Sequence, residues 1–68
     1  MNAVELLIRL SGKTQKDFSE IVGIPGSNLS EMKKGKRDIP LSKFIEWCKL
    51  VDVDILEVFT EYKKYAQK

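Results

Sequence analysis

Positively charged side chains gather near the middle of this 68-residue sequence, where Lys33, Lys34, Lys36 and Arg37 are interrupted only by Gly35. Ammonium and guanidinium groups at this density can neutralise the phosphates of a nucleic acid and release its counterions. A basic run of this kind can also be a solvated loop that keeps a protein in solution. The formal net charge of +2 is too small to decide between the two interpretations, so the elements around the run must decide.

The composition excludes several kinds of catalytic and metal site. The chain has no histidine and one cysteine, Cys48, which rules out a Cys/His zinc site, an intrachain disulfide and Cys–His or Ser–His nucleophile chemistry. A chain of this size offers no cleft in which to bury a pair of catalytic carboxylates. We therefore expect no enzymatic activity and no cofactor. The lone cysteine, the lack of a signal-like start and the lack of an apolar stretch near 20 residues favour a cytoplasmic protein without membrane contact.

Apolar residues recur at helical spacing, and no segment alternates with period two for long enough to be a strand. This pattern predicts five helices in one all-α domain spanning residues 1–68, with a core at about 3–59 and a helical extension at about 60–66. The first helix is expected at about residues 3–10 and the fourth at about 41–51. The second runs between Thr14 and Gly23, the third opens at Pro25 or Ser27 and closes at Gly35, and the fifth follows Asp54.

The helix boundaries carry recognisable capping signals. Three capping boxes are expected, at Asn2 with Glu5, Thr14 with Asp17 and Asp54 with Glu57. In such a box the first side chain accepts from a free backbone amide and the acid reaches back to the amide of the cap residue. Gly12 and Gly23 stand where helices commonly end in left-handed backbone, and Asp52 occupies the corresponding position after the fourth helix.

Two apolar stripes run along the last two predicted helices. The first consists of Leu41, Phe44, Ile45, Cys48 and Val51, and the second of Ile55, Val58, Phe59, Tyr62 and Tyr65. Cys48 is therefore expected to be a buried core thiol. Trp47, beside the first stripe, either completes the core or marks a partner surface. The second stripe is longer than one small core requires, so its helix either folds back onto the first helix or forms a dimer surface.

The second and third predicted helices meet the requirements of a helix-turn-helix unit. Such a unit needs a residue able to take positive φ at its short turn, and Gly23 can do so. It needs a small side chain where the helices approach most closely, which Ser19 provides. It also needs apolar inner faces, supplied here by Phe18, Val22, Ile24, Leu29 and Met32.

The run TQKDFSEIVGI at residues 14–24 resembles the opening of this motif in Cro/cI-type phage repressors and Xre-like bacterial regulators. The resemblance continues without a gap through Leu29, Met32 and the KGKR run at residues 34–37. It extends into the last two helices, at Leu41, Phe44, Ile45, Val51, Val53, Ile55 and Phe59, which match core positions of that family. It implies a five-helix, lambda-repressor-like DNA-binding domain over about residues 4–59.

The resemblance also implies roles for individual positions. The positions that match base-reading residues are Gly26, Ser27, Asn28 and Glu31. Those that match phosphate contacts are Gln15, Lys16, Lys33, Lys34, Lys36 and Arg37. Asn28 can pair with adenine and Glu31 can accept from the amino group of cytosine, whereas Ser27 either contacts DNA or caps its helix.

Two departures from the family pattern affect the third helix. Pro25 and Gly26 replace a polar pair that commonly opens it, so the helix is shorter or shifted and lacks one base-reading side chain. Glu31 places a negative charge toward a polyanion, which lowers affinity unless Glu31 meets a cytosine or pairs with a nearby lysine. Both changes bear on sequence preference more than on DNA binding itself.

Together these features predict a sequence-specific transcriptional regulator of bacterial, phage or mobile-element type. Its expected partner is double-stranded DNA carrying an inverted-repeat operator, and its expected state is a homodimer. Two alternatives stay open: a helix-turn-helix adaptor or antirepressor that binds another protein, and the DNA-binding half of a longer repressor. The basic run favours DNA binding, since a protein interface does not require it.

Overall fold

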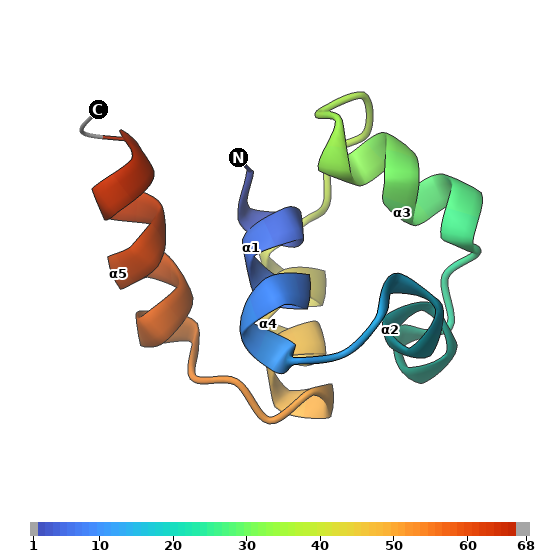
Figure 1. The fold of residues 1–68 in the computed structure, drawn as a ribbon, viewed down its shortest axis with the longest axis horizontal. Helices are drawn as coiled ribbons and strands as arrows, with labels where there is room; N and C mark the ends of the chain where they lie inside the picture. Colours follow the sequence, from blue (N-terminus) through green and yellow to red (C-terminus); the bar gives the residue numbers. More distant parts are fainter. Residues whose placement is uncertain (1, 67–68) are drawn as a thin grey trace.

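The computed structural model describes residues 2–66 and, among their side chains, those of residues 2–64. The described chain forms five helices and no strand (Figure 1): α1 (Ala3–Ser11), α2 (Gln15–Val22), α3 (Gly26–Lys33), α4 (Leu41–Leu50) and α5 (Ile55–Ala66). The predicted all-α class and the order of the helices are confirmed. No helix in this part of the chain is long and apolar enough to cross a membrane.

The caps at the helix starts form as predicted, but each makes one side-chain bond rather than two. The Asn2 side chain accepts from the Glu5 amide at 3.0 Å, and the Thr14 hydroxyl accepts from the Asp17 amide at 3.1 Å. The Asp54 carboxylate accepts from the Leu56 amide at 2.9 Å instead of from that of Glu57. The described hydrogen bonds do not include a return bond from an acidic side chain, so these are single caps rather than capping boxes.

The second half of the chain shows how a helix can end in left-handed backbone without glycine. Asp52 has φ 58° directly after α4. Its amide donates to the Lys49 carbonyl at 3.3 Å, and the Val53 amide donates to the Cys48 carbonyl at 2.9 Å. This pair of bonds is the Schellman motif, which satisfies the last carbonyls of a helix and reverses the chain. The position predicted for Asp52 is confirmed.

The core lies where α1 meets the other helices. Figure 1 shows α1 between α5 and α3, and contacts join α1 to both of them and α2 to α3 and α4. The largest fully buried side chains come from four of the five helices: Leu6, Leu7, Phe18, Leu29 and Val58. The remaining helix, α4, contributes Trp47 to this core. The Trp47 ring meets the Phe18 ring edge to face, with ring centroids 5.8 Å apart.

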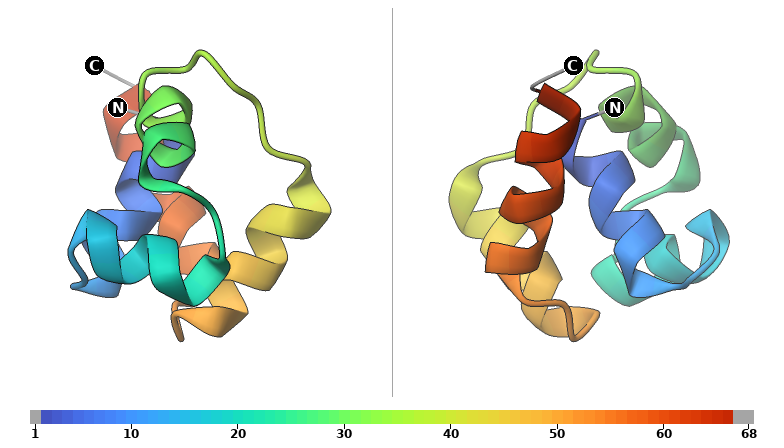
Figure 2. Two further views of the ribbon diagram at one scale, coloured as in Figure 1. Left: turned by 90° about the vertical axis from the view of Figure 1, so that its right-hand side faces the viewer. Right: turned by 60° about the vertical axis from the view of Figure 1, so that its left-hand side comes forward.

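The apolar stripe of α4 is rotated from the predicted one. Trp47 is only 3% exposed, so it completes the core, whereas Leu41 is 61% exposed and Ile45 is 36% exposed. The prediction that Leu41 and Ile45 belong to the core was therefore wrong. The left view of Figure 2 shows that the first turn of α4 extends away from the other helices, which accounts for the exposure of Leu41. Cys48 is buried as predicted, and desolvation raises the pKa of its thiol, which keeps it neutral.

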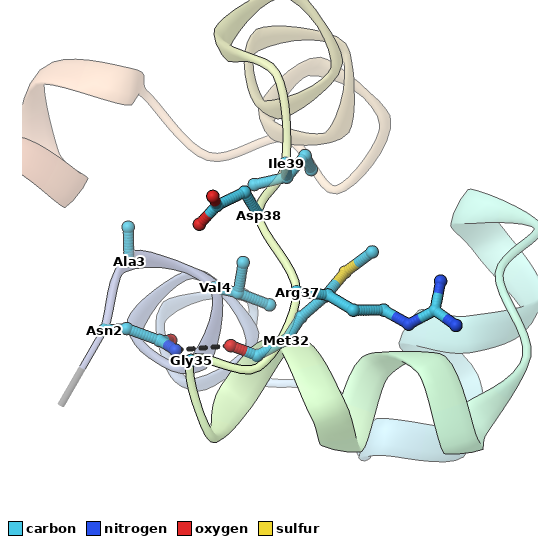
Figure 3. A pocket seen from close by; sticks show the side chains of 8 residues that line it. All are labelled: Asn2, Ala3, Val4, Met32, Gly35, Arg37, Asp38 and Ile39. Atoms are coloured by element: carbon cyan, nitrogen blue, oxygen red, sulfur yellow. Dashed lines mark hydrogen bonds between the residues drawn. The ribbon is translucent and has the colours of Figure 1, made fainter.

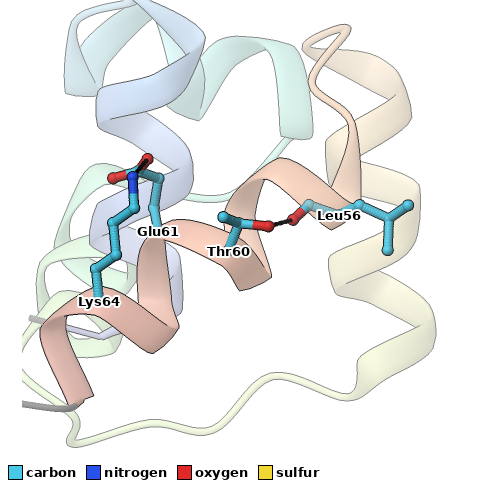
Figure 4. Close-up of polar contacts among 4 residues, drawn as sticks. All are labelled: Leu56, Thr60, Glu61 and Lys64. Atoms are coloured by element: carbon cyan, nitrogen blue, oxygen red, sulfur yellow. Dashed lines mark hydrogen bonds and ion pairs between the residues drawn. The ribbon is translucent and has the colours of Figure 1, made fainter.

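Helix α5 packs against α1 and still exposes apolar side chains. Val58 is fully buried, but Phe59 is 44% exposed and Leu56 is 68% exposed, so the prediction of Phe59 as a core residue was wrong. Tyr62 is exposed as well, and the side chain of Tyr65 lies outside the described residues. Along its polar side, the Thr60 hydroxyl donates to the Leu56 carbonyl and Lys64 pairs with Glu61 (Figure 4). The fold-back onto α1 is therefore observed, with an apolar face left over.

The turn after α2 generates the first test of the fold. Gly23 has φ 74°, and a Cβ added there would meet no atom within 4 Å. We expect Gly23→Ala to lower the free energy of unfolding by about 1–2 kcal/mol through backbone strain alone. Gly23→Val is expected to cost more, because a β-branched residue tolerates positive φ poorly. Urea-unfolding curves followed by circular dichroism measure both.

Gly26→Ala is the matched control, because Gly26 is helical and its added Cβ would also meet no atom within 4 Å. Alanine is favoured over glycine in a helix by up to about 1 kcal/mol, so this variant should be at least as stable as the parent. Equal unfolding midpoints for Gly23→Ala and Gly26→Ala would contradict the assigned turn.

Candidate nucleic-acid interface

The connection between α2 and α3 is organised by Ser19. The backbone carbonyl of Ser19 accepts from the amides of Gly23 at 2.9 Å and Ile24 at 3.2 Å. Its hydroxyl donates to the Ile24 carbonyl. Ser19 was expected only to be small, and it also supplies hydrogen bonds that hold the two residues after α2. The chain can then reverse within three residues and present α3 across α2 (Figure 1).

Helix α3 begins at Gly26, and Pro25 occupies the capping position. The Pro25 side chain makes no capping hydrogen bond, but its φ of −56° suits entry into a helix, and its carbonyl accepts from the Leu29 amide at 3.1 Å. Of the two predicted openings, Pro25 is therefore the one observed. Ser27 lies inside the helix, so it is not the cap residue.

The side chains of α3 divide among three directions. Leu29 is fully buried and Met32 packs partly against the core, which fixes the inner face. Ser27 and Glu31, four residues apart, share the opposite face, with the half-buried Asn28 beside them. The outward positions expected to read bases are thus brought together, except that Gly26 turns toward α2, where its carbonyl accepts a hydrogen bond.

Gln15, at the first turn of α2, bridges the two helices instead of extending into solvent. Its side-chain amide donates to the Ser30 hydroxyl at 2.9 Å and to the Gly26 carbonyl at 3.2 Å. Its side-chain oxygen accepts from the Lys33 ammonium at 3.1 Å. Gln15 therefore holds the start of α2 along the side of α3, from Gly26 to Lys33. Ser30 was not among the predicted site residues, although its spacing from Gly26 and Lys33 places all three on one face of a helix.

The other residues predicted to contact phosphates lie around α2 and α3 and differ in their exposure and in their ion pairing. Lys16, Lys34 and Lys36 are exposed and make no ion pair among the described residues. Lys33 is half-buried against Gln15, and the Nε of Arg37 donates to the Glu31 carboxylate at 3.0 Å. The anticipated partner of Glu31 was a lysine, and the residue observed there is an arginine from the loop after α3.

Two open hollows flank the end of α3. One, of about 260 Å³, is lined by Glu5, Ser30, Lys33 and Lys34. The other, of about 210 Å³, lies between the start of α1 and the loop after α3, where the Asn2 side chain donates to the Met32 carbonyl (Figure 3). Neither contains a nucleophile paired with a base, and the described residues hold no cluster of three or more potential metal ligands.

The comparisons with known proteins agree with this geometry. The model of a helix-turn-helix family matches residues 5–58, which covers α1 to α4 and the first turn of α5. Searches of curated proteins and of solved structures found no match. The matched region ends at Val58, and α5 continues beyond it to Ala66.

The bridge made by Gln15 predicts coupling between two helices. We expect Gln15→Ala and Ser30→Ala each to lower the free energy of unfolding by about 0.5–1.5 kcal/mol. The double variant should lose clearly less than the sum, because both changes remove the same hydrogen bond. Urea unfolding of all four proteins gives the coupling energy.

Ser27→Ala combined with Gln15→Ala is the control pair, because Ser27 makes no side-chain hydrogen bond among the described residues. The two losses should then add. Additive losses for Gln15 and Ser30 as well would show that the two side chains act separately.

Proposed function

Because this chain belongs to the Cro/C1-type helix-turn-helix family of DNA-binding transcription regulators, we propose that it binds double-stranded DNA with α3 in the major groove. It acts as a sequence-specific regulator of bacterial, phage or mobile-element type, without a catalytic step and without a cofactor. The observation that carries this proposal is the outward face of α3, where Ser27, Asn28 and Glu31 lie opposite the buried Leu29. Polar side chains on a firmly anchored helix are what base reading requires.

Each outward side chain suits a different base contact. Asn28 can donate to and accept from adenine, and Glu31 can accept from the amino group of cytosine. Ser27, at the second position of α3, is short and reaches either a base edge or a nearby phosphate. Gly26, at the first position of the helix, supplies no base-reading side chain, and its carbonyl is held by Gln15.

Backbone contacts come from the basic residues around this face. Lys16 on α2, and Lys34 and Lys36 after α3, offer exposed ammonium groups to phosphates. Lys33 and Gln15 act as a linked pair at the junction of the two helices. Gln15 lies at the N-terminus of α2, where free amides and the helix dipole favour an anion. Arg37 adds the sixth contact from the loop.

An adaptor that binds another protein is the competing function. Exposed lysines without ion-pair partners contribute little to a protein interface, whose centre is depleted of lysine. The same groups supply most of the affinity for a polyanion. Their position beside α3 therefore favours DNA.

The first functional test concerns Lys34. Lys34→Ala should weaken binding to all DNA sequences about equally and reduce the slope of log affinity against log salt by about 0.9. Mobility-shift titrations of duplex DNA at several salt concentrations measure this slope.

Lys63→Ala is the matched control, since Lys63 is exposed on α5, across α1 from α3 (Figure 1). It should leave the slope unchanged. Equal slopes for the parent and Lys34→Ala would place Lys34 outside the interface, and the same result for Arg37→Ala would place the basic run outside it. No binding at any salt concentration would favour the adaptor.

We further propose that the protein is a twofold-symmetric homodimer joined through α5. The support is the apolar face of α5 that α1 leaves uncovered, formed by Leu56, Phe59 and Tyr62. One small domain buries little surface on DNA, so two half-sites read together give a more useful affinity. The expected operator is an inverted repeat whose half-site centres lie about ten base pairs, or about 34 Å, apart.

A charge placed on this face tests the dimer. Leu56→Glu should convert the protein to a monomer in sedimentation equilibrium and reduce its preference for an inverted repeat over a single half-site, because a carboxylate is costly to bury in an apolar interface.

Leu41→Glu makes the same change at a similarly exposed leucine, 61% against 68%, on the far end of α4. Its mass should equal that of the parent. A monomeric parent, or an unchanged mass for Leu56→Glu, would exclude α5 as the dimer surface.

A further inference from the structure

The loop after α3 folds back onto Glu31. Gly35 has φ 78°, and its amide donates to the Met32 carbonyl at 3.1 Å, while the Lys36 amide donates to the Glu31 carbonyl at 2.9 Å. These two bonds are the Schellman motif. In this motif the two residues joined by the bond that spans five positions in the sequence often make an apolar contact as well. Here both of those residues, Glu31 and Lys36, are charged, and the loop is joined to the helix in another way.

The additional link is the ion pair between Arg37 and Glu31. Arg37 Nε lies 3.0 Å from Glu31 Oε2, and the two side chains are 51% and 43% exposed. Figure 3 shows the Arg37 side chain running back along α3, with its guanidinium group lying over the helix. The described contacts use only Nε and Oε2, so the second carboxylate oxygen and both terminal guanidinium nitrogens remain available.

Folding stability does not explain this arrangement. An ion pair exposed to solvent on both sides stabilises a protein weakly, and salt screens it. DNA binding makes it more consequential, since a lone carboxylate on the outward face of α3 would be repelled by the phosphates. Held by Arg37, the carboxylate approaches DNA as part of an ion pair that has no net charge, and its orientation is restricted.

We propose that Glu31 and Arg37 form one recognition unit that reads a C·G base pair, which deepens and rests on the proposed DNA-binding function. Glu31 accepts from the cytosine amino group through its second oxygen. Arg37 is the positioning residue, because its Nε holds the carboxylate while its terminal nitrogens donate to a neighbouring phosphate. Arg37 thereby contributes to sequence preference as well as to affinity, which distinguishes it from Lys34.

The experiment first selects preferred sites from a random duplex library with the full-length protein. Affinities are then measured for the selected site and for the same site with the C·G pair replaced by T·A, since thymine presents an acceptor where cytosine presents a donor. The parent should prefer C·G by about tenfold or more. Arg37→Ala and Glu31→Gln should each reduce this ratio to about twofold or less, and Arg37→Ala should not reduce it further in the Glu31→Gln background.

Lys34→Ala is the matched control, because it removes a neighbouring positive charge that has no ion-pair partner among the described residues. It should weaken binding to both sites equally and keep the ratio. Glu31→Gln should also bind non-specific duplex more tightly than the parent, since it removes a negative charge from the interface. Urea-unfolding midpoints close to that of the parent are expected for all variants, because the pair is exposed.

The outcomes separate the two proposals. If Arg37→Ala weakens both sites equally and keeps the ratio, Arg37 is a phosphate contact only, and the recognition unit is wrong while DNA binding stands. The recognition unit is also wrong if no cytosine in the selected sites can be found whose replacement lowers the affinity in a way that depends on Glu31. A parent that enriches no sequence and binds no duplex overturns the proposed function itself.

Discussion

Helices of eight to twelve residues are too short to be stable alone in water, and each helix in the described residues 2–66 falls in that range. Each therefore exists only while it buries an apolar face against the others. The shared core around Leu7, Phe18 and Leu29 is the constraint on which the rest depends. Because α3 has only Leu29 fully buried, its position is sensitive to every contact that orients it.

Those contacts are mostly polar. The Gln15 side chain joins the start of α2 to Gly26, Ser30 and Lys33 along α3, and at the last turn Asn2 donates to the Met32 carbonyl. The core thus sets how deeply α3 sits, and the hydrogen bonds set its direction. The Gln15 and Asn2 contacts do not use the outward face, which leaves it available for the proposed recognition. Precise placement of short side chains such as Ser27 and Asn28 requires such a fixed helix.

The sequence predicted the helices well because their signals are local. Thr14 as a cap, Gly23 as a left-handed end and Asp52 as its non-glycine equivalent each depend on neighbours within a few residues. The errors concern which side of a helix faces the core, as at Leu41 and Phe59. Periodicity identifies an apolar stripe but does not show whether another helix lies opposite it. No helix lies opposite the first turn of α4 or the outer side of α5 in the described residues.

The candidate interface was predictable in its residue types and unpredictable in its pairing. The residues quoted from the family pattern do surround α3, but their contacts to one another depend on the path of the loop. Gly35 turns that loop back, and only then does Arg37 reach Glu31 rather than solvent. The role of Ser30 was likewise not predictable from the sequence, because its partner Gln15 lies on a different helix.

The proposed interface assigns DNA binding and sequence discrimination to different charged groups. Exposed lysines attract any duplex, and their contribution falls steeply as salt rises. In the proposed complex, Glu31 opposes that attraction wherever it meets no cytosine, and this would lower the affinity for wrong sequences more than for the right one. Because the formal net charge of the chain is only +2, its non-specific affinity for DNA is expected to be small. Pairing Glu31 with Arg37 limits this loss, because the repulsive charge is partly neutralised while the carboxylate keeps an oxygen for the base.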